Sequence, residues 1–438
     1  MEENFIFLRK GAILILLLTF LFSGLLLSGL PAEVRAEEGE VIRVGVVGPY
    51  TGDNPRLGLE MRYAVEMAMA EIDYQLGDYQ VELLWVDSAS DPEKAVRAYE
   101  DAILREEMDV GLLNWHSSVA LALMEVSSRY EIPHFFGLGA TELVNERYHS
   151  DPGANSETEA NNYWMAKGWP VPEKLSVGYV LALESAIVEG SWEPENKRAA
   201  IFGENYDWGL SFGSALEELF REAGWEIEEK DYFDRHETDL YPLLSRIRDV
   251  EAEVVGGSIT SSASLAAFLT QAREIGLESL IVLDGLDWID DWYDLTGETS
   301  DYILEQVPQW ATAESLQFKD EFQQEYELTP GASTAGLAYD YAVFFIRMAQ
   351  AALDKYGELN SETLYEFGRQ ELSTGNFTFT EGIMMEEYKY TADSVPDPIV
   401  GEGYFIFPVV QYIQGEGNII WPDRLQEAEL TVPENSEY

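Results

Sequence analysis

Apolar runs of strand length alternate along the first third of the chain with segments whose apolar residues recur at helical spacing. Asp91 and Pro92 form an N-cap followed by proline at the first helical position, which predicts a helix start there. The predicted strands are Val41–Gly48, Val81–Val86, Val110–Asn114 and Pro133–Leu138. The predicted helices are Leu59–Gln75, Asp91–Glu107 and Val119–Tyr130. This alternation is typical of a doubly wound parallel sheet.

The polar, turn-rich segment Tyr148–Asn162 interrupts this rhythm and predicts a loop or a crossing to a second lobe. The same alternation then restarts. The predicted strands of the second block are Arg198–Gly203, Trp225–Phe233, Glu253–Ser258 and Leu280–Leu283. Its predicted helices are Leu175–Val188, Leu210–Ala223, Asp239–Val250 and Ser262–Ile275. Two similar blocks in tandem indicate an α/β protein of two doubly wound parallel-sheet lobes joined by a hinge.

The last third of the chain changes character, with long helices followed by alternating, antiparallel-type strands. The predicted helices are Ser315–Tyr326, Ala335–Leu353 and Ser361–Glu371, and the predicted strands are Ile303–Val307, Phe377–Phe379, Tyr404–Phe407 and Val410–Ile413. We expect residues 37–165 and 302–374 to form the N-terminal lobe. Residues 166–301 and 375–423 are expected to form the C-terminal lobe, followed by an acidic tail at 424–438.

The N-terminus has the features of an export signal. Arg9 and Lys10 precede an apolar run, Gly11–Leu30, and Val34–Ala36 offers small residues for signal peptidase. We expect cleavage after residue 36, which places the mature protein outside the cytoplasmic membrane. The alternative is an uncleaved anchor, because the run is long enough to span a bilayer. The chain has no cysteine, so a lipidated cysteine is excluded.

The charge of the chain is strongly acidic, with 81 Asp and Glu against 27 Lys and Arg and a net charge of −54. No basic face is available to neutralise phosphates, which argues against a nucleic-acid partner. The acidic residues are spread along the whole sequence. This favours a surface adapted to high salt, where self-repulsion is screened, over a dedicated cation-binding protein.

The motifs of common enzymes are missing. The sequence has no G-x-S-x-G, no phosphate-binding loop, no cysteine and no H-E-x-x-H among its four histidines. The run Asp284–Asp291 resembles a calcium loop but lacks the required spacing. We therefore expect no enzyme activity, no cofactor and no metal site.

Ligands of open α/β sheets bind beyond the carboxyl ends of the strands. The residues at these predicted ends are hydroxyl-bearing, aromatic or small side chains and one carboxylate, a set that suits a small polar ligand. The candidate ligand-binding residues are Tyr50, Trp115, Ser117, Ser118, Ala140, Thr141, Tyr206, Trp208, Thr260 and Asp284.

Several segments carry a resemblance to a known family. They are Gly45–Gly52 with Gly58, Ile132–Thr141, Ala199–Gly209, Thr238–Leu244, Gln271–Leu277 and Ala338–Asp340. In order and spacing they resemble the type I periplasmic solute-binding proteins of ABC transporters, the group that includes the Leu/Ile/Val-binding proteins. The resemblance runs from about Val41 to Trp421. It implies a two-lobed Venus-flytrap fold that closes on a small molecule and delivers it, as a monomer, to a membrane permease.

The resemblance also implies roles for individual residues toward an amino-acid ligand. Ser117, Ser118 and Thr141 correspond to the carboxylate site, at a helix start whose dipole favours an anion. Ala140 and Asp284 correspond to the ammonium site, and Trp208 to the aromatic ring that covers the ligand.

The chain departs from the family pattern at three places, which leaves the ligand open. Ser258–Thr260 stands where an aromatic residue is frequent, Trp115 where a smaller apolar residue is common, and Tyr148–Lys197 is longer than usual. An amino acid is the expected ligand. An uncharged amide or urea-type ligand and a membrane-tethered sensor domain are the alternatives.

Overall fold

The computed structural model describes residues 40–150, 163–289 and 292–432. The chain divides into Met1–Glu40 and a compact unit, Val41–Tyr438, and the description below concerns the second unit. The expected signal peptide, most of the Tyr148–Asn162 segment and the end of the acidic tail lie outside the described residues. Among the helices that are described, none combines the length and the apolar character needed to cross a bilayer.

The first sheet has six strands in the order β2-β3-β1-β4-β5-β6. All neighbouring strands are parallel except β2 and β3, which form an antiparallel pair. The strands are β1 (Val41–Gly48), β2 (Gln75–Leu76), β3 (Tyr79–Asp87), β4 (Val110–Leu112), β5 (His134–Gly137) and β6 (Trp164–Lys167). Because β1 is central, nearly all of its side chains are buried.

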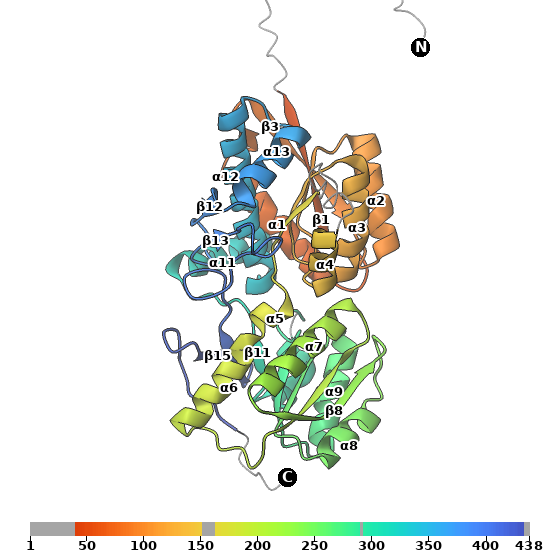
Figure 1. The fold of residues 1–438 in the computed structure, drawn as a ribbon, viewed down its shortest axis with the longest axis vertical. Helices are drawn as coiled ribbons and strands as arrows, with labels where there is room; N and C mark the ends of the chain where they lie inside the picture. The colour runs from red at the N-terminus through yellow and green to blue at the C-terminus, as the bar shows by residue number, and fades with distance from the viewer. Residues whose placement is uncertain (1–39, 151–162, 290–291, 433–438) are drawn as a thin grey trace, which may run out of the picture. The chain divides into compact units, whose positions relative to one another are not determined.

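The helices of the first lobe come from both ends of the chain (Figure 1). Those from the N-terminal part are α1 (Pro55–Ala70), α2 (Pro92–Glu106), α3 (Ser117–Tyr130) and α4 (Glu142–Ser150). Those from the C-terminal part are α11 (Ala313–Tyr326), α12 (Leu337–Tyr356) and α13 (Ser361–Phe367), with the short hairpin β12 (Thr378–Phe379) and β13 (Tyr388–Lys389). Phe344 of α12 stacks on Phe136 of β5, and Phe345 contacts the ring of Phe135 at a tilt, so α12 completes the core of the first lobe.

The second sheet has seven strands in the order β15-β14-β11-β10-β9-β7-β8. It is parallel from β8 to β11 and ends in the antiparallel strands β14 and β15. The strands are β7 (Arg198–Glu204), β8 (Glu226–Phe233), β9 (Val254–Ser258), β10 (Leu280–Asp284), β11 (Leu304–Gln306), β14 (Val409–Ile413) and β15 (Glu416–Trp421). Its helices are α5 (Pro172–Leu175), α6 (Val177–Glu189), α7 (Asp207–Glu222), α8 (Tyr241–Asp249), α9 (Ser262–Glu274) and α10 (Trp292–Thr296).

The chain passes between the two lobes three times: between β6 and α5, between β11 and α11, and between β13 and β14. The expected architecture, two lobes with doubly wound, mainly parallel sheets, is confirmed. The sheet pairing assigns β11 to the second sheet, whereas the expected segments group it with the first lobe. The exact lobe boundaries stay a prediction.

Individual strands differ from the expectations in two ways. The strand expected at Tyr404–Phe407 is wrong, because this segment is a loop with one isolated bridge between Val400 and Phe405. Phe405 and Phe407 alternate like residues of a strand but are buried in the core. Conversely, β2, β6, β13 and β15 were not predicted.

Candidate functional site

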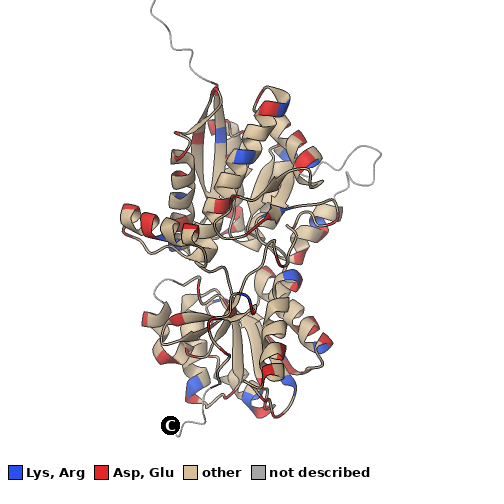
Figure 2. Ribbon diagram, turned by 90° about the vertical axis from the view of Figure 1, so that its left-hand side faces the viewer, with Lys and Arg blue, Asp and Glu red and all other residues tan. Residues whose placement is uncertain are grey.

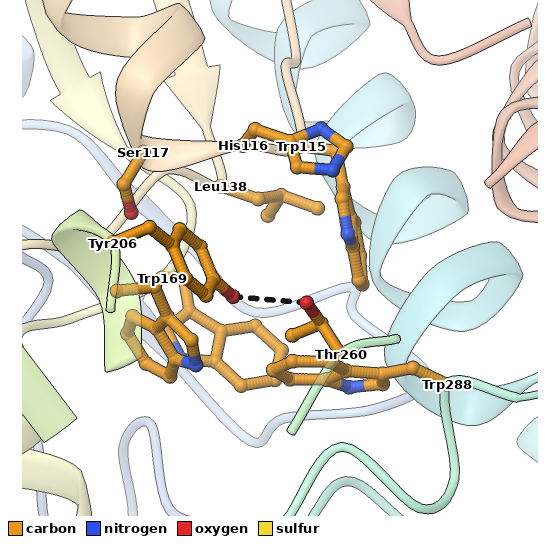
Figure 3. A pocket seen from close by; sticks show the side chains of 9 residues that line it. Trp115, His116, Ser117, Leu138, Trp169, Tyr206, Thr260 and Trp288 are labelled. Carbon is orange, nitrogen blue, oxygen red and sulfur yellow. Dashed lines mark hydrogen bonds between the residues drawn. The ribbon is translucent and has the colours of Figure 1, made fainter. Parts of the chain in front are cut away.

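A cavity lies where loops from the carboxyl ends of both sheets meet (Figure 3). The space between its lining residues is about 430 Å³ and includes open solvent. The first lobe contributes Trp115, His116, Ser117 and Leu138, and the chain crossing after β6 contributes Trp169. The second lobe contributes Tyr206, Trp208, Thr260 and Trp288. We call this the Trp-lined cavity.

Four indole rings form most of its walls, with Trp288 in contact with the other three. The ring centroid of Trp288 is 5.6 Å from that of Trp115, 6.2 Å from that of Trp169 and 6.2 Å from that of Trp208. The planes of Trp115 and Trp169 lie at 83° and 76° to that of Trp288. Edge-to-face contacts of this kind fix the rings relative to one another.

Ser117 forms a polar corner of the cavity. It is the first residue of α3, and its Oγ accepts hydrogen bonds from the backbone N–H groups of Ala140 (3.2 Å) and Thr141 (3.3 Å). The adjacent His116 is half-buried, and desolvation together with the nearby Arg235 guanidinium lowers its pKa to about 3. The imidazole is therefore neutral at physiological pH.

Glu204 holds the polar edge of the second lobe in place. This buried carboxylate accepts hydrogen bonds from the Thr260 hydroxyl (2.7 Å), from the Thr260 N–H (3.0 Å) and from the Ser261 N–H (3.0 Å). The Tyr206 hydroxyl in turn donates to Thr260 Oγ1 (3.1 Å). The hydroxyl groups of Thr260 and Tyr206 thus already have protein partners.

Asp284 lies behind the cavity wall and not among its lining residues. Its Oδ2 accepts hydrogen bonds from Trp208 Nε1 (2.7 Å) and from the Ser258 hydroxyl (2.8 Å), and the residue is 2% exposed. Burial raises its pKa to about 7, although both hydrogen bonds act in the opposite direction. In this arrangement Asp284 positions the indole of Trp208.

The loop that carries Trp288 depends on a third buried carboxyl group. Glu305 accepts hydrogen bonds from the backbone N–H groups of Gly285 (2.8 Å), Leu286 (2.9 Å) and Asp287 (3.0 Å). Gly285 has a φ of +120°, and a Cβ atom there would lie 2.1 Å from the carbonyl oxygen of Ile259. Glycine is therefore required for the turn that presents Trp288.

The structure places five of the ten expected residues in the cavity lining: Trp115, Ser117, Tyr206, Trp208 and Thr260. Ala140 and Thr141 contact Ser117 from behind, and Asp284 contacts Trp208 from behind. Ser118 follows Ser117 on α3 but is not in the lining. Tyr50 lies elsewhere, because its hydroxyl donates to the Val46 carbonyl (3.0 Å) and its ring packs on Trp85.

The sequence expectations missed four lining residues: His116, Leu138, Trp169 and Trp288. His116 and Leu138 are next to residues at predicted strand ends. The rule that ligands bind beyond the carboxyl ends of strands could therefore have identified them. Trp169 follows β6, which was not predicted. Trp288 lies inside the acidic run Asp284–Asp291, which in the sequence is compared only with a calcium loop. The part of that run which is described, like the rest of the described chain, contains no cluster of three or more metal-ligating side chains.

Comparisons with known proteins agree with this architecture. The "Leu/Ile/Val-binding protein homolog 6" of Brucella suis is 20% identical over 245 residues, and the match covers 56% of this chain and 57% of that protein. The chain thus spans little more than half the length of this curated relative. A putative branched-chain amino acid ABC transporter protein from Silicibacter pomeroyi has a similar structure, with a TM-score of 0.76, 16% identity, and coverage of 90% of this chain and 99% of that chain.

A solute-binding protein from Rhodopseudomonas palustris BisB5, solved in complex with 3,4-dihydroxybenzoic acid, has a TM-score of 0.66 and 18% identity and covers 86% of this chain and 95% of that chain. At such identities the structural likeness establishes the fold. The family model described as "Periplasmic binding protein" matches residues 41–378 of the 438. The chain therefore belongs to the periplasmic binding protein family.

Proposed function

We propose that this protein is the extracytoplasmic solute-binding component of an ABC importer and that it holds a small organic carboxylate in the Trp-lined cavity. The observation that carries this proposal is that residues from both lobes line one cavity. A solute that contacts both lobes stabilises their closed arrangement, which a membrane permease can then recognise. The protein acts without catalysis and as a monomer.

Amino acids are the ligand class expected from the sequence. The names of the Brucella relative and of the Silicibacter neighbour support this class. A specific observation favours aromatic carboxylates as a second class, because four of the nine lining residues are tryptophan. The ligand of the Rhodopseudomonas neighbour supports the same class.

A thermal-shift screen tests the function itself. The purified chain is heated in high salt with amino acids, small amides, urea and aromatic acids. A bound solute at 100 times its Kd stabilises the folded state by about 2.7 kcal/mol, so at least one compound is expected to raise the melting temperature. Mass spectrometry of the exported protein checks for a start near Glu37, as a retained anchor would favour the sensor alternative.

A variant that fills the cavity supplies the control. Thr260→Arg places a long side chain in the lining and is expected to abolish the shift, whereas Thr374→Arg on the surface leaves it intact. A screen in which no solute shifts the melting temperature contradicts the proposed function. So does a Thr260→Arg variant that still responds.

A further inference from the structure

The Trp-lined cavity has an unusual chemical balance. Its nine lining residues include four indoles, one phenol and one imidazole, and none of them is Asp, Glu, Lys or Arg. Flat aromatic walls at steep angles to one another favour a flat, unsaturated ring over a branched aliphatic chain, because rings gain both area and edge-to-face contacts.

The polar groups that remain unused on the lining include two hydrogen-bond donors. Trp288 Nε1 is buried without a partner among the described residues, and no described residue accepts the hydroxyl hydrogen of Ser117. His116 Nδ1 is also buried and unpartnered, and in a neutral imidazole this nitrogen donates or accepts according to the tautomer. Buried donors without partners are rare in folded proteins, so these groups indicate an acceptor on the solute.

The carboxyl groups nearest the cavity lie outside its lining. Glu204 accepts hydrogen bonds from Thr260 and Ser261 through both oxygens, and Asp284 accepts hydrogen bonds from Trp208 and Ser258 through Oδ2. An ammonium group in the cavity would find no carboxylate on the lining. The guanidinium of Arg235 lies 5.6 Å from the Tyr206 ring centroid, but it is paired with the Asp53 carboxylate at 3.4 Å and so adds no net charge on this side.

We infer that the solute is a planar aromatic monocarboxylate that carries no ammonium group. This inference rests on the proposed function. The ring lies against Trp288 and its neighbours, and the carboxylate accepts hydrogen bonds from the Ser117 corner, next to the start of α3, where the helix dipole also favours an anion.

Calorimetry with five probes tests this inference. The purified chain is titrated in high salt with benzoate, 4-hydroxybenzoate, L-phenylalanine, L-leucine and glycine betaine. We expect one-to-one binding of at least one benzoate. L-Phenylalanine presents the same ring with an ammonium group and is expected to bind at least about 100-fold more weakly, because that ammonium would be buried without a partner.

Two variants test the assigned contacts with the benzoate that binds. Trp288→Leu removes the central ring and is expected to weaken binding at least about tenfold. Ser117→Ala removes one donor and is expected to weaken it about tenfold as well. Trp310→Leu is the matched control, since Trp310 stacks on Phe318 of the first lobe, outside the cavity lining, and should leave the affinity unchanged. Melting temperatures without ligand show whether each variant is folded.

The outcomes separate this inference from the function on which it rests. The inference of an aromatic monocarboxylate is overturned if L-leucine, L-phenylalanine or glycine betaine binds while benzoate and 4-hydroxybenzoate do not. The proposed solute-binding function would still stand. A folded Trp288→Leu variant with unchanged affinity for a benzoate also overturns it. If none of the five probes binds, the inference fails, and the broader thermal-shift screen decides whether the proposed function fails with it.

Discussion

Asp284 illustrates, at the scale of single residues, how a correct position can leave the chemical role open. Its place at the end of β10 could be read from the sequence, because an apolar run ends there. The direction of its side chain could not, since that depends on Trp208 at the start of α7, 76 positions away in the chain. The same limit applies to Trp288, whose place in the cavity depends on a turn fixed by Gly285 and Glu305.

The buried carboxyl of Asp284 predicts a pH-dependent stability. Its pKa is about 7 in the folded protein, against about 3.9 for an unfolded chain. The folded state binds the proton more tightly, so the contribution is full below pH 4 and is lost as the pH rises through 7. From pH 4 to 7.5, the parent should lose up to roughly 4 kcal/mol of unfolding free energy relative to Asp284→Asn.

Urea denaturation of both proteins at these pH values measures this difference. Asp423→Asn, an exposed position, serves as the control and should show a constant difference from the parent. If Asp284→Asn also keeps a constant difference, Asp284 does not titrate in this range.

At the scale of elements, continuous apolar runs were sufficient to predict most strands, and β1 matches its expected bounds. Strand β6 was missed because Trp164–Lys167 is short and ends in a lysine, which in a sequence suggests a surface. Lys167 is instead fully buried, and its Nζ lies 2.8 Å from the Asp397 carboxylate and 2.6 Å from Asn145 Oδ1. Only tertiary structure reveals this partner, 230 residues away.

This ion pair predicts that removing one partner lowers the unfolding free energy more than removing both. Lys174 also contacts Asp397 (2.6 Å), and although burial raises the pKa of that carboxyl, the two lysines more than offset this and lower it. Lys167→Met removes one of the two cations from a buried carboxylate and is expected to cost about 3–5 kcal/mol of unfolding free energy. The double variant Lys167→Met with Asp397→Leu should recover much of this loss, because no buried charge remains in the pair.

Chemical denaturation measures both variants. Lys355→Met removes a surface ion pair with Glu371 and provides a matched control, expected to cost at most about 1 kcal/mol. A loss for Lys167→Met no larger than that of Lys355→Met would show that the buried pair contributes little.

For the whole molecule, the dominant property is charge. Figure 2 shows Asp and Glu on helices and loops around both sheets, not in one patch. With a net charge of −54, these residues repel one another, and salt screens that repulsion. We expect the melting temperature to rise by roughly 10 °C from low salt to about 2 M KCl, equivalent to several kcal/mol. Differential scanning fluorimetry measures this, with sucrose as a control that stabilises without screening charge. A flat response to KCl would contradict the salt-adapted surface.

The three crossings between the lobes determine the order in which parts of the chain can fold. The first sheet is complete at Lys167, but α11 and α12, which cover part of it, follow the five parallel strands of the second sheet in the sequence. Most of the second sheet, from β7 to β11, comes from one continuous stretch. Contacts between residues far apart in the sequence, such as those of the first sheet with α12, form slowly. Domains usually fold from the N-terminus onward during synthesis. In this protein strands β7 to β11 of the second sheet can assemble first. The first sheet can complete its core only after α12, Leu337–Tyr356, has been synthesised.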